Sequence, residues 1–354
     1  MEEGQILTTQ EAIDKLVSKV DLVSLPSGIK EKLDEIFNQL KINAHSETNF
    51  WATYQSASKY TEWVISLPWF TETQDILDID YTNEKLKEGH YGLDSVKERI
   101  IEYVSVLALQ KSRAPDQNMR APVLLFSGLV GTGKTTMAQS IADVLGRQII
   151  RIPFGGLGDP LYLRGRSRSY PDAEPGAILK GLVQCKSKNP VILLDEIDRV
   201  ADDALNTIMG VLVELLDPEQ NARFVDHYLD YPFDLSRVLF CATCNNTSRI
   251  ATAVLDRLEV IQMPSYTDEE KTAIGRDYLF PKAMKESGLD LSEIQISPDV
   301  WPQIVRPLGF DAGVRTLKRN IEGLCRKVAY LIFSGKAKQV IIDTNNVKQF
   351  IPQW

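Results

Sequence analysis

The sequence predicts an α/β fold with a parallel five-stranded sheet, preceded by a helical segment and followed by a small helical domain. In the middle of the chain, short apolar runs alternate with amphipathic stretches. Strands that alternate with helices pair in parallel, because a crossover is needed to return to the same sheet edge. Elsewhere apolar residues recur mainly at helical spacing. We therefore expect a helical segment over residues 1–88, an α/β domain over 89–265 and a second helical domain over 266–354.

Residues 8–88 are read as helical. Thr8 and Glu11 have the spacing of a capping box, which starts a helix, and apolar residues then recur at helical spacing. Pro26 interrupts this pattern. Pro68 removes a backbone donor and restricts the residue before it, so we expect it to end a third helix that is rich in aromatic residues.

The elements after residue 88 follow from the same patterns. The predicted strands of the sheet are Val123–Ser127, Gln148–Pro153, Val191–Asp195, Val238–Thr243 and Glu259–Met263. Helices are predicted between them at Lys134–Leu145 and Ala201–Leu216. After Pro264 strands largely cease: we expect helices from Thr267 to Met284, over Gly313–Ser334 and over Asn345–Phe350, with a short strand at Gln339–Ile342.

The composition is that of a globular protein with a buried core. The chain has 354 residues, 44% of them hydrophobic, which is enough for two or three domains. A net charge of −8 argues against broad contact with nucleic acid or anionic lipid. No apolar run approaches the roughly 18 residues of a membrane span, and the acidic N-terminus is unlike a secretory signal. We therefore expect a cytoplasmic protein that has no membrane partner.

Cys241 and Cys244 have the C-x-x-C spacing of a metal or redox site. A structural zinc ion takes four ligands. The remaining candidates are Cys185, Cys325, His45, His90 and His227, and no two of them form a second closely spaced pair. Because the C-x-x-C pair ends an apolar stretch, buried and reduced cysteines are the favoured interpretation.

The most specific motif is a phosphate-binding loop. Gly128-Leu129-Val130-Gly131-Thr132-Gly133-Lys134-Thr135 matches G-x-x-x-x-G-K-[ST], follows a predicted strand and opens a predicted helix that continues with Thr136. Glycines let the backbone curl so that its amides face phosphate oxygens, and the helix start adds free N–H groups. Lys134 is placed to neutralise the β- and γ-phosphates, and Thr135 to offer a hydroxyl to Mg²⁺. A simple glycine turn is the alternative, and the complete match argues against it.

Asp195 and Glu196 follow the apolar strand Val191–Asp195 and form the second half of this site. Ligands of open α/β sheets bind at the carboxyl ends of the strands. Asp195 would hold Mg²⁺ through its water shell, and Glu196 would polarise the attacking water. Apolar strands often end in an acidic residue, so this motif is informative only together with the loop. The sequence therefore predicts a binding site for ATP and Mg²⁺.

Three further polar residues are candidates for reading the γ-phosphate. Asn245 follows a predicted strand, Arg257 precedes the last strand of the sheet, and Arg315 begins a helix of the second helical domain. An amide can orient water without adding charge, and arginine pairs bidentately with phosphate. Judged from the residues alone, each arginine is more often an ordinary surface residue.

The order Gly-Lys-Thr, Leu-Leu-Asp-Glu-Ile-Asp and Leu-Asp-Arg identifies the chain as similar to AAA+ ATPases. Several longer segments resemble the Lon protease family more closely. They are His90-Tyr91-Gly92-Leu93, Arg164-Gly165 with Arg168-Ser169-Tyr170, Leu216-Asp217-Pro218-Glu219-Gln220-Asn221, Asp226-His227-Tyr228-Leu229, Tyr266-Thr267-Asp268-Glu269-Glu270-Lys271 and Gly313-Val314-Arg315. The resemblance covers about residues 50–350.

This resemblance implies the fold of an AAA+ P-loop NTPase with a helical lid, in a hexameric ring that threads unfolded protein through a central pore. It also implies a role for individual residues. Asn245 corresponds to the sensor-1 residue, Arg257 to the arginine finger of the neighbouring subunit, Arg315 to the sensor-2 residue, His90-Tyr91-Gly92 to an adenine contact and Tyr170 to the pore-loop aromatic residue.

Two departures from the family pattern fall in these motifs. Leu129-Val130 replaces two prolines in the phosphate loop, which leaves that loop less pre-set. Pro171-Asp172 follows Tyr170, where the family has an aliphatic residue and glycine. The second departure bears directly on the grip on substrate.

We expect no peptidase activity from this chain. Trp354 is the last residue, where the Lon peptidase domain would begin, and the β-rich N-terminal domain of Lon is also missing. An excised segment and a stand-alone ATPase both fit, and a separate or deleted peptidase domain is an expected partner.

Two other function classes share parts of the motif set. A nucleic-acid-linked AAA+ ATPase, such as a clamp loader or branch-migration motor, would carry the same loop, but the acidic charge and the lack of an appended helix-turn-helix domain argue against it. A non-catalytic assembly protein switched by nucleotide would not need both Glu196 and Arg257. An ATP-driven protein unfoldase is therefore the leading hypothesis.

Overall fold

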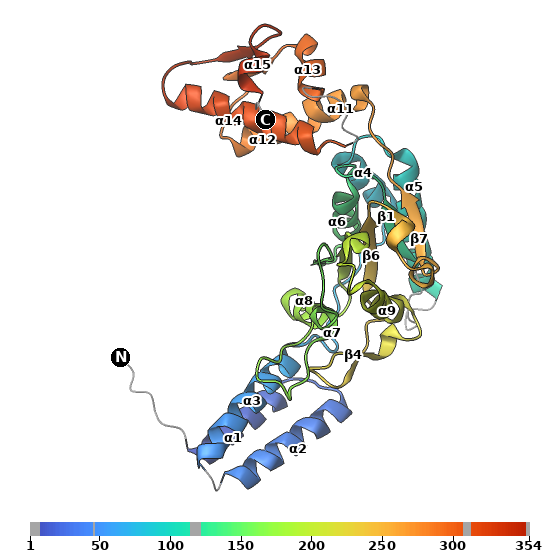
Figure 1. Ribbon diagram of the computed structural model, residues 1–354, viewed down its shortest axis with the longest axis vertical. Coiled ribbons are helices and arrows are strands. Elements are labelled where there is room, and N and C mark those ends of the chain that lie inside the picture. Colours follow the sequence, from blue (N-terminus) through green and yellow to red (C-terminus); the bar gives the residue numbers. More distant parts are fainter. Residues whose placement is uncertain (1–7, 45–46, 114–121, 307–312, 352–354) are drawn as a thin grey trace.

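The computed structural model describes residues 8–44, 47–113, 122–306 and 313–351. The N-terminal helices lie at one end of an elongated, curved molecule, the sheet lies in its middle and a second helical part lies at the other end (Figure 1). No helix in these described ranges is long and apolar enough to cross a membrane.

The N-terminal part consists of α1 (Thr9–Asp21), α2 (Ser27–Asn43) and α3 (Glu47–Ser66). Thr8 caps α1 in a complete capping box with Glu11, as the spacing predicts. The three helices bury a shared apolar side that includes Leu16, Leu33 and Tyr60. Helix α3 ends two residues before Pro68, as expected for a residue that restricts the preceding backbone.

Residues 67–78 connect this helical part to the sheet without helix or strand, although residues 8–88 were predicted to be helical. Tertiary contacts hold this segment extended. The Thr73 amide donates to Asn189 Oδ1 at 2.7 Å, and the Ile76 amide donates to the Leu145 carbonyl at 3.0 Å. Asp75 is buried and pairs with the buried Arg147 guanidinium at 2.7 and 2.9 Å. These partners are distant in sequence, so local periodicity does not reveal the segment.

The predicted parallel five-stranded sheet is confirmed, with strand order β2-β3-β6-β1-β7. The strands are β1 (Val123–Ser127), β2 (Ile149–Pro153), β3 (Val191–Asp195), β6 (Leu239–Cys244) and β7 (Leu258–Gln262). Alternate side chains of each strand enter two apolar cores, one on each face of the sheet. Because the strands are parallel, all of their carboxyl ends meet at one edge of the sheet.

Helices and short elements surround this sheet. The helices are α4 (Ile79–Gly89), α5 (Asp94–Arg113), α6 (Lys134–Leu145), α7 (Leu161–Arg164), α8 (Ala177–Cys185), α9 (Leu205–Leu216) and α10 (Thr252–Leu255). Short 3₁₀ turns cover Ile197–Arg199, Asn221–Arg223 and Thr247–Arg249, and β4 (Phe224–Val225) pairs with β5 (Pro232–Phe233). Helix α6 matches the predicted range, whereas α9 begins four residues later than predicted.

The C-terminal helical part has its own apolar core. Its elements are α11 (Asp268–Ile274), α12 (Phe280–Glu286), the 3₁₀ turn Pro298–Val300, α13 (Trp301–Val305), α14 (Arg315–Phe333), α15 (Val347–Phe350) and the parallel pair β8 (Ile294–Ile296) and β9 (Val340–Ile342). A π-helical turn at Gly275–Leu279 joins α11 to α12. The helix predicted from Thr267 to Met284 is therefore continuous but contains a π-bulge.

All four cysteines are free. Cys241 and Cys244 are buried in β6, and burial raises the pKa of Cys241 to about 12. Within the described ranges, no group of three or more His, Cys, Asp or Glu side chains is arranged to hold a metal ion.

Candidate active site

The loop between β1 and α6 has a backbone that requires glycine. Gly131 and Gly133 have φ values of +82° and +98°, in the left-handed region that favours glycine. At Gly128 an added Cβ would lie 2.6 Å from the carbonyl oxygen of Met263. Gly133 caps α6, whose first residues, Lys134 and Thr135, therefore carry free N–H groups directed at the loop.

Lys134 lies across this loop. Its ammonium donates to the carbonyls of Gly128 and Leu129 at 2.7 and 2.9 Å and to Asn245 Oδ1 at 3.0 Å. The side chain is nearly buried, and desolvation lowers the pKa of Lys134. The ammonium group could replace these hydrogen bonds with hydrogen bonds to a phosphate group, whose oxygens are stronger acceptors.

Asp195 ends β3 next to the start of α6. Its Oδ1 accepts hydrogen bonds from Thr243 Oγ1 at 2.5 Å and from Thr135 Oγ1 at 3.3 Å. Its Oδ2 accepts from Arg151 Nε at 2.7 Å. The carboxylate and the Thr135 hydroxyl are oxygen ligands of the kind that Mg²⁺ takes in nucleotide sites, so these residues fit the ion. Thr243 and Arg151 belong to the same network, and the sequence motifs alone did not single them out.

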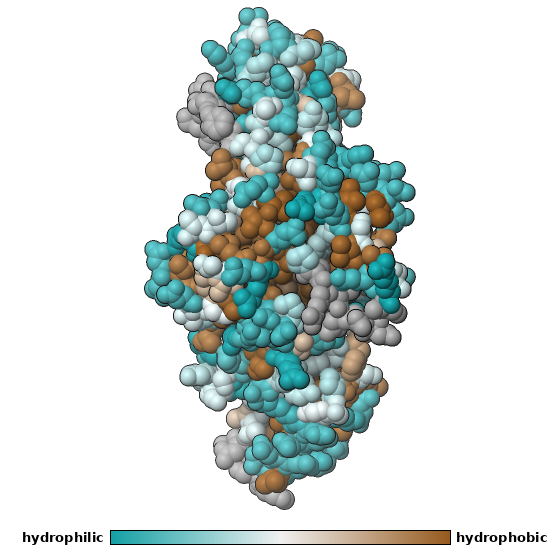
Figure 2. Space-filling model, turned by 90° about the vertical axis from the view of Figure 1, so that its right-hand side faces the viewer, coloured by the Kyte–Doolittle hydropathy of each residue, from teal (hydrophilic) through white to brown (hydrophobic). Residues whose placement is uncertain are grey.

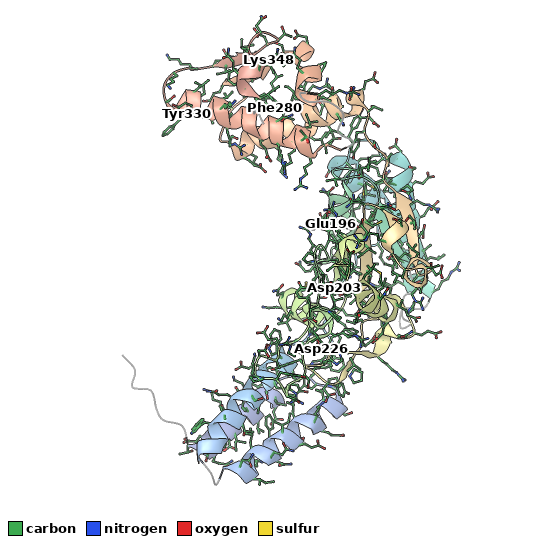
Figure 3. All side chains as sticks on the ribbon, viewed as in Figure 1. Glu196, Asp203, Asp226, Phe280, Tyr330 and Lys348 are labelled. Carbon is green, nitrogen blue, oxygen red and sulfur yellow. The ribbon has the colours of Figure 1, made fainter. Side chains whose placement is uncertain are left out.

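Glu196 turns away from the strand direction immediately after Asp195. Its φ of +59° is unusual for a residue with a side chain, and its amide donates to Thr243 Oγ1 at 2.9 Å. The carboxylate is partly exposed and lies 3.7 Å from the Arg199 guanidinium. Glu196 therefore faces solvent beside the buried Asp195, and Figure 3 labels it close to the sheet.

Asn245 follows β6 and carries a buried amide nitrogen, Nδ2, that has no hydrogen-bond partner in the described part of the chain. Asp198 holds the backbone here, because its Oδ2 accepts the amides of Asn245 and Asn246 at 3.0 and 3.1 Å. Buried donors are normally paired, so this nitrogen fits a site whose acceptor is a phosphate or a bound water. Asp198 was part of the quoted Leu-Leu-Asp-Glu-Ile-Asp motif, which is the signal that could have found it.

The second helical part reaches the same loop. The Val314 amide donates to the Gly131 carbonyl at 3.0 Å. A Cβ built on Gly131 would lie 3.2 Å from the Cβ of Arg315, the first residue of α14. Arg315 is therefore brought to the phosphate loop, although it follows Gly131 by 184 residues in the sequence (315 − 131 = 184).

Arg257 lies elsewhere. The next residue, Leu258, pairs with Val123 at the amino end of β1, while the phosphate loop follows the carboxyl end. The Arg257 guanidinium donates to Asp217 Oδ2 at 2.9 Å and to the Ala253 carbonyl at 2.7 Å. Arg257 is thus separated from the phosphate loop of its own chain by the length of a strand.

The segment His90-Tyr91-Gly92 lies beside α6 and the second helical part. His90 Nε2 is 2.9 Å from Ser140 Oγ, and desolvation, with a smaller contribution from Lys97, lowers the pKa of His90 to about 4. Tyr91 packs edge-on against Tyr278, with ring centroids 6.3 Å apart. Gly92 adopts a φ of +59°. These residues thus join α6 to the second helical part through contacts with Ser140 and Tyr278.

Tyr170 is exposed on a loop over residues 165–176, away from the phosphate loop. Asp226 is fully buried at the base of this loop: its Oδ2 accepts the Gly176 amide at 2.7 Å and its Oδ1 accepts the Tyr228 amide at 2.8 Å. The Arg168 guanidinium lies 3.9 Å from the ring centroid of Tyr60 on α3. Figure 3 labels Asp226 where the sheet part meets the N-terminal helices.

Two family models match the chain. One describes an ATPase family associated with various cellular activities (AAA) and covers residues 124–266, and the other describes the Lon protease AAA+ ATPase lid domain and covers residues 285–341. The AAA match implies nucleotide binding, and members of this family are generally oligomeric.

Curated relatives agree with these models. A Lon protease of Lawsonia intracellularis is 40% identical over 350 residues, which is 99% of this chain and 41% of the relative. Lon protease 1 of Bacillus subtilis is 39% identical over 340 residues, which is 96% of this chain and 42% of the relative. The chain thus spans less than half the length of these relatives. It is an AAA+ ATPase module that resembles the ATPase region of Lon proteases.

Proposed function

We propose that this chain binds ATP with Mg²⁺ at the loop Gly128–Thr136 and hydrolyses it. The observation that supports this most is the meeting of Lys134, Asn245, Asp195 and Arg315 around one glycine loop. Lys134 would neutralise the β- and γ-phosphates, and Arg315 would pair with phosphate oxygens from the lid. Thr135 and Asp195 would hold the Mg²⁺, which supplies charge for the phosphates.

Two side chains next to the loop have the chemistry that hydrolysis requires. The Glu196 carboxylate faces solvent and is suited to polarise a water molecule. The unpartnered Asn245 Nδ2 is suited to orient that water or a phosphate oxygen. His90, Tyr91 and Gly92 would line the adenine. These roles follow from the position and chemistry of each side chain, and substitution of each residue tests them.

A ring assembly accounts for Arg257. Within one chain this residue lies at the opposite sheet end from the phosphate loop, so it would reach the nucleotide of a neighbouring subunit. Exposed apolar residues Val106 and Leu109 on α5 and Val260 on β7 support an interface on this side. Figure 2 shows apolar surface gathered over the middle of the face that carries α5 and β7. We infer a hexamer.

The partner we propose is unfolded protein, gripped by Tyr170 and moved by cycles of ATP hydrolysis. Tyr170 is 59% exposed on a loop that is anchored at its base, which suits an aromatic contact with a passing chain. Pro171 and Asp172, which follow Tyr170, differ from the family pattern, so the contact of this loop with substrate would differ as well. The free cysteines fit a reducing compartment such as the cytoplasm.

The test measures ATP hydrolysis with Mg²⁺ alone, with a permanently unfolded carboxymethylated protein and with single- or double-stranded DNA. We expect turnover that the unfolded protein accelerates and that DNA leaves unchanged. Lys134→Ala serves as the control and should abolish nucleotide binding, because the loop then lacks its phosphate cation. Acceleration by DNA alone would favour a nucleic-acid motor, and no turnover in a verified hexamer would favour a nucleotide-switched assembly protein.

A further inference from the structure

Arg151 contacts the carboxylate that the proposed function assigns to Mg²⁺. It lies on β2, the edge strand next to β3, and its Nε and Nη2 lie 2.7 and 2.5 Å from Asp195 Oδ2. The register pairs Arg151 with Leu193, so Asp195 is its diagonal neighbour on the same sheet face. A long side chain spans this separation without strain.

The two members of this ion pair have very different surroundings. The side chain of Asp195 is 3% exposed, whereas that of Arg151 is 62% exposed. The other carboxylate oxygen, Oδ1, already accepts hydrogen bonds from Thr243 and Thr135. The Asp195 side chain is therefore held in place by the protein. The Arg151 side chain is mostly solvated, so it can move away from Asp195 with little loss of buried surface.

A divalent cation and this guanidinium would compete for one carboxylate. A metal ion placed between Thr135 and Asp195 carries twice the charge of the guanidinium and would repel it at close range. The guanidinium also occupies Oδ2, which water molecules bound to the metal would otherwise reach. Binding of the ion and retention of the Arg151 contact therefore oppose each other.

The open cleft beside β2 offers Arg151 other partners. Its lining includes Arg151 together with Asp159, Asp172 and Glu174, which belong to the segment on either side of Tyr170. Asp172 and Glu174 have mostly exposed side chains that already pair with Arg166 and Lys180 in the same cleft. A released arginine would thus enter a solvated, charged cleft, in which three carboxylates lie among the cations of Arg166 and Lys180, instead of an apolar one.

We propose that Arg151 is a releasable counter-ion of Asp195, which holds the carboxylate in the absence of metal and is displaced when Mg²⁺ and nucleotide bind. Arg151 then sets how strongly nucleotide affinity depends on Mg²⁺. This inference rests on the proposed Mg–nucleotide site. Displacement of Arg151 by Mg²⁺ and nucleotide would also move a charged side chain into the cleft beside the Tyr170 loop.

The test compares the affinity of a fluorescent ADP with Mg²⁺ and with EDTA. In Arg151→Gln the dissociation constant in EDTA divided by that with Mg²⁺ should rise roughly two- to fivefold, because the competitor of the metal is gone. The dissociation constant in EDTA should change little. Arg151→Lys keeps a cation and should lie nearer to wild type. Arg166→Gln is the matched control, since it removes an arginine of the same cleft that pairs with Asp172, and its ratio should equal that of wild type.

The outcomes separate the inference from the proposed function. An unchanged ratio in Arg151→Gln would overturn the competition, and a lowered ratio would show instead that Arg151 stays in place and orients Asp195. A wild-type protein that binds no nucleotide would overturn the proposed site and, with it, this role. Thermal unfolding of each variant checks that the exposed substitution leaves the fold intact.

Discussion

The nucleotide pocket and the loop that carries Tyr170 are held in place by different means. Pocket residues lie at the carboxyl ends of neighbouring strands, so the sheet itself brings Lys134, Asp195 and Asn245 together. The Tyr170 loop instead depends on side chains from distant segments, namely Asp226 at its base and Tyr60 beside its tip. The position of the first region follows from topology, and that of the second follows from two specific contacts.

Asn245 and Asp198 in the pocket differ from Asp226 at the loop base in how fully their polar atoms are paired. In the pocket, Asn245 Nδ2 and Asp198 Oδ1 are buried and have no hydrogen-bond partner among the residues described. At the loop base, both oxygens of Asp226 accept backbone amides. Unpaired buried groups suit a region that receives a polar ligand, and paired groups suit a region that holds a fixed shape. The unpaired atoms of the pocket thus suit ligand binding, and the paired carboxylate of Asp226 suits a rigid loop base.

The largest effect should come from the pocket. In Glu196→Gln the amide keeps the size of the side chain but cannot take a proton from water, so turnover should fall roughly 100- to 1,000-fold. Nucleotide affinity should stay within about threefold, since Lys134 and the loop are untouched. Single-turnover ATP hydrolysis and nucleotide titration measure the two quantities.

A matching change in the loop region makes this comparison sharper. Glu174→Gln alters an exposed carboxylate whose ion-pair partners are Lys180 and Lys59, and among the residues that the structure describes no ion pair joins it to Asp195 or to the phosphate loop. Its basal turnover should equal that of wild type. Equal losses in Glu196→Gln and Glu174→Gln would show that chemistry is not confined to the pocket.

Sequence patterns predicted that Lys134, Asp195 and Asn245 would lie together, because each of them is local to the end of a strand. Each motif stands directly after an apolar strand, and parallel pairing then aligns the strand ends. The predicted strands of the sheet agree with the observed ones to within one residue at each end, because turn residues in the sequence mark the ends of a buried strand. Arg315 needed the family resemblance, since nothing local joins α14 to the loop across Gly131.

Partners that are distant in sequence were not predictable in the same way. Residues 67–78 read as part of a helical segment, yet the pairing of Asp75 with Arg147 and the contacts of Thr73 hold them extended. Asp226 stood in a recognisable Asp-His-Tyr-Leu motif, but a motif does not state which amides a carboxylate accepts. The Arg151 contact with Asp195 depends on strand order, which places β2 beside β3.

The pocket region should also respond to pH through a buried histidine. Because burial lowers the pKa of His90 to about 4 from a usual 6.5, the unfolded chain binds a proton that the folded chain rejects in this interval. The free energy of unfolding should therefore fall as pH drops from about 6.5 to about 4, by at most about 3 kcal/mol. Denaturant titrations across this range measure the slope.

His90→Gln isolates this contribution, since an amide can bond to Ser140 Oγ but does not titrate. The variant should show a shallower slope than wild type over this pH interval. Parallel slopes for wild type and His90→Gln would contradict the assignment of this titration to the pocket.

The smallest effect in free energy should arise at the loop base. In Asp226→Asn one carboxylate oxygen becomes an N–H donor that faces a backbone N–H, either of Gly176 or of Tyr228 and Leu229. One lost acceptor at a buried site costs about 1–2 kcal/mol. Because the lost bond closes the loop over residues 165–176, we expect local opening there while the sheet stays folded.

Limited proteolysis with cleavage-site mapping measures that opening, and cleavage within residues 165–176 should rise roughly tenfold, as expected for a local cost of this size. Basal ATP hydrolysis should stay near wild type. Acceleration by unfolded protein should fall, because the loop that carries Tyr170 is no longer anchored at its base. Asp230→Asn is the matched control: the exposed side chain of this neighbour pairs with Lys32 on α2, and the substitution keeps its backbone hydrogen bond to the Asp226 carbonyl. If Asp226→Asn lowered basal turnover as much as acceleration, the loop and the pocket would form one cooperative unit, and the distinction between a topological site and an anchored one would fail.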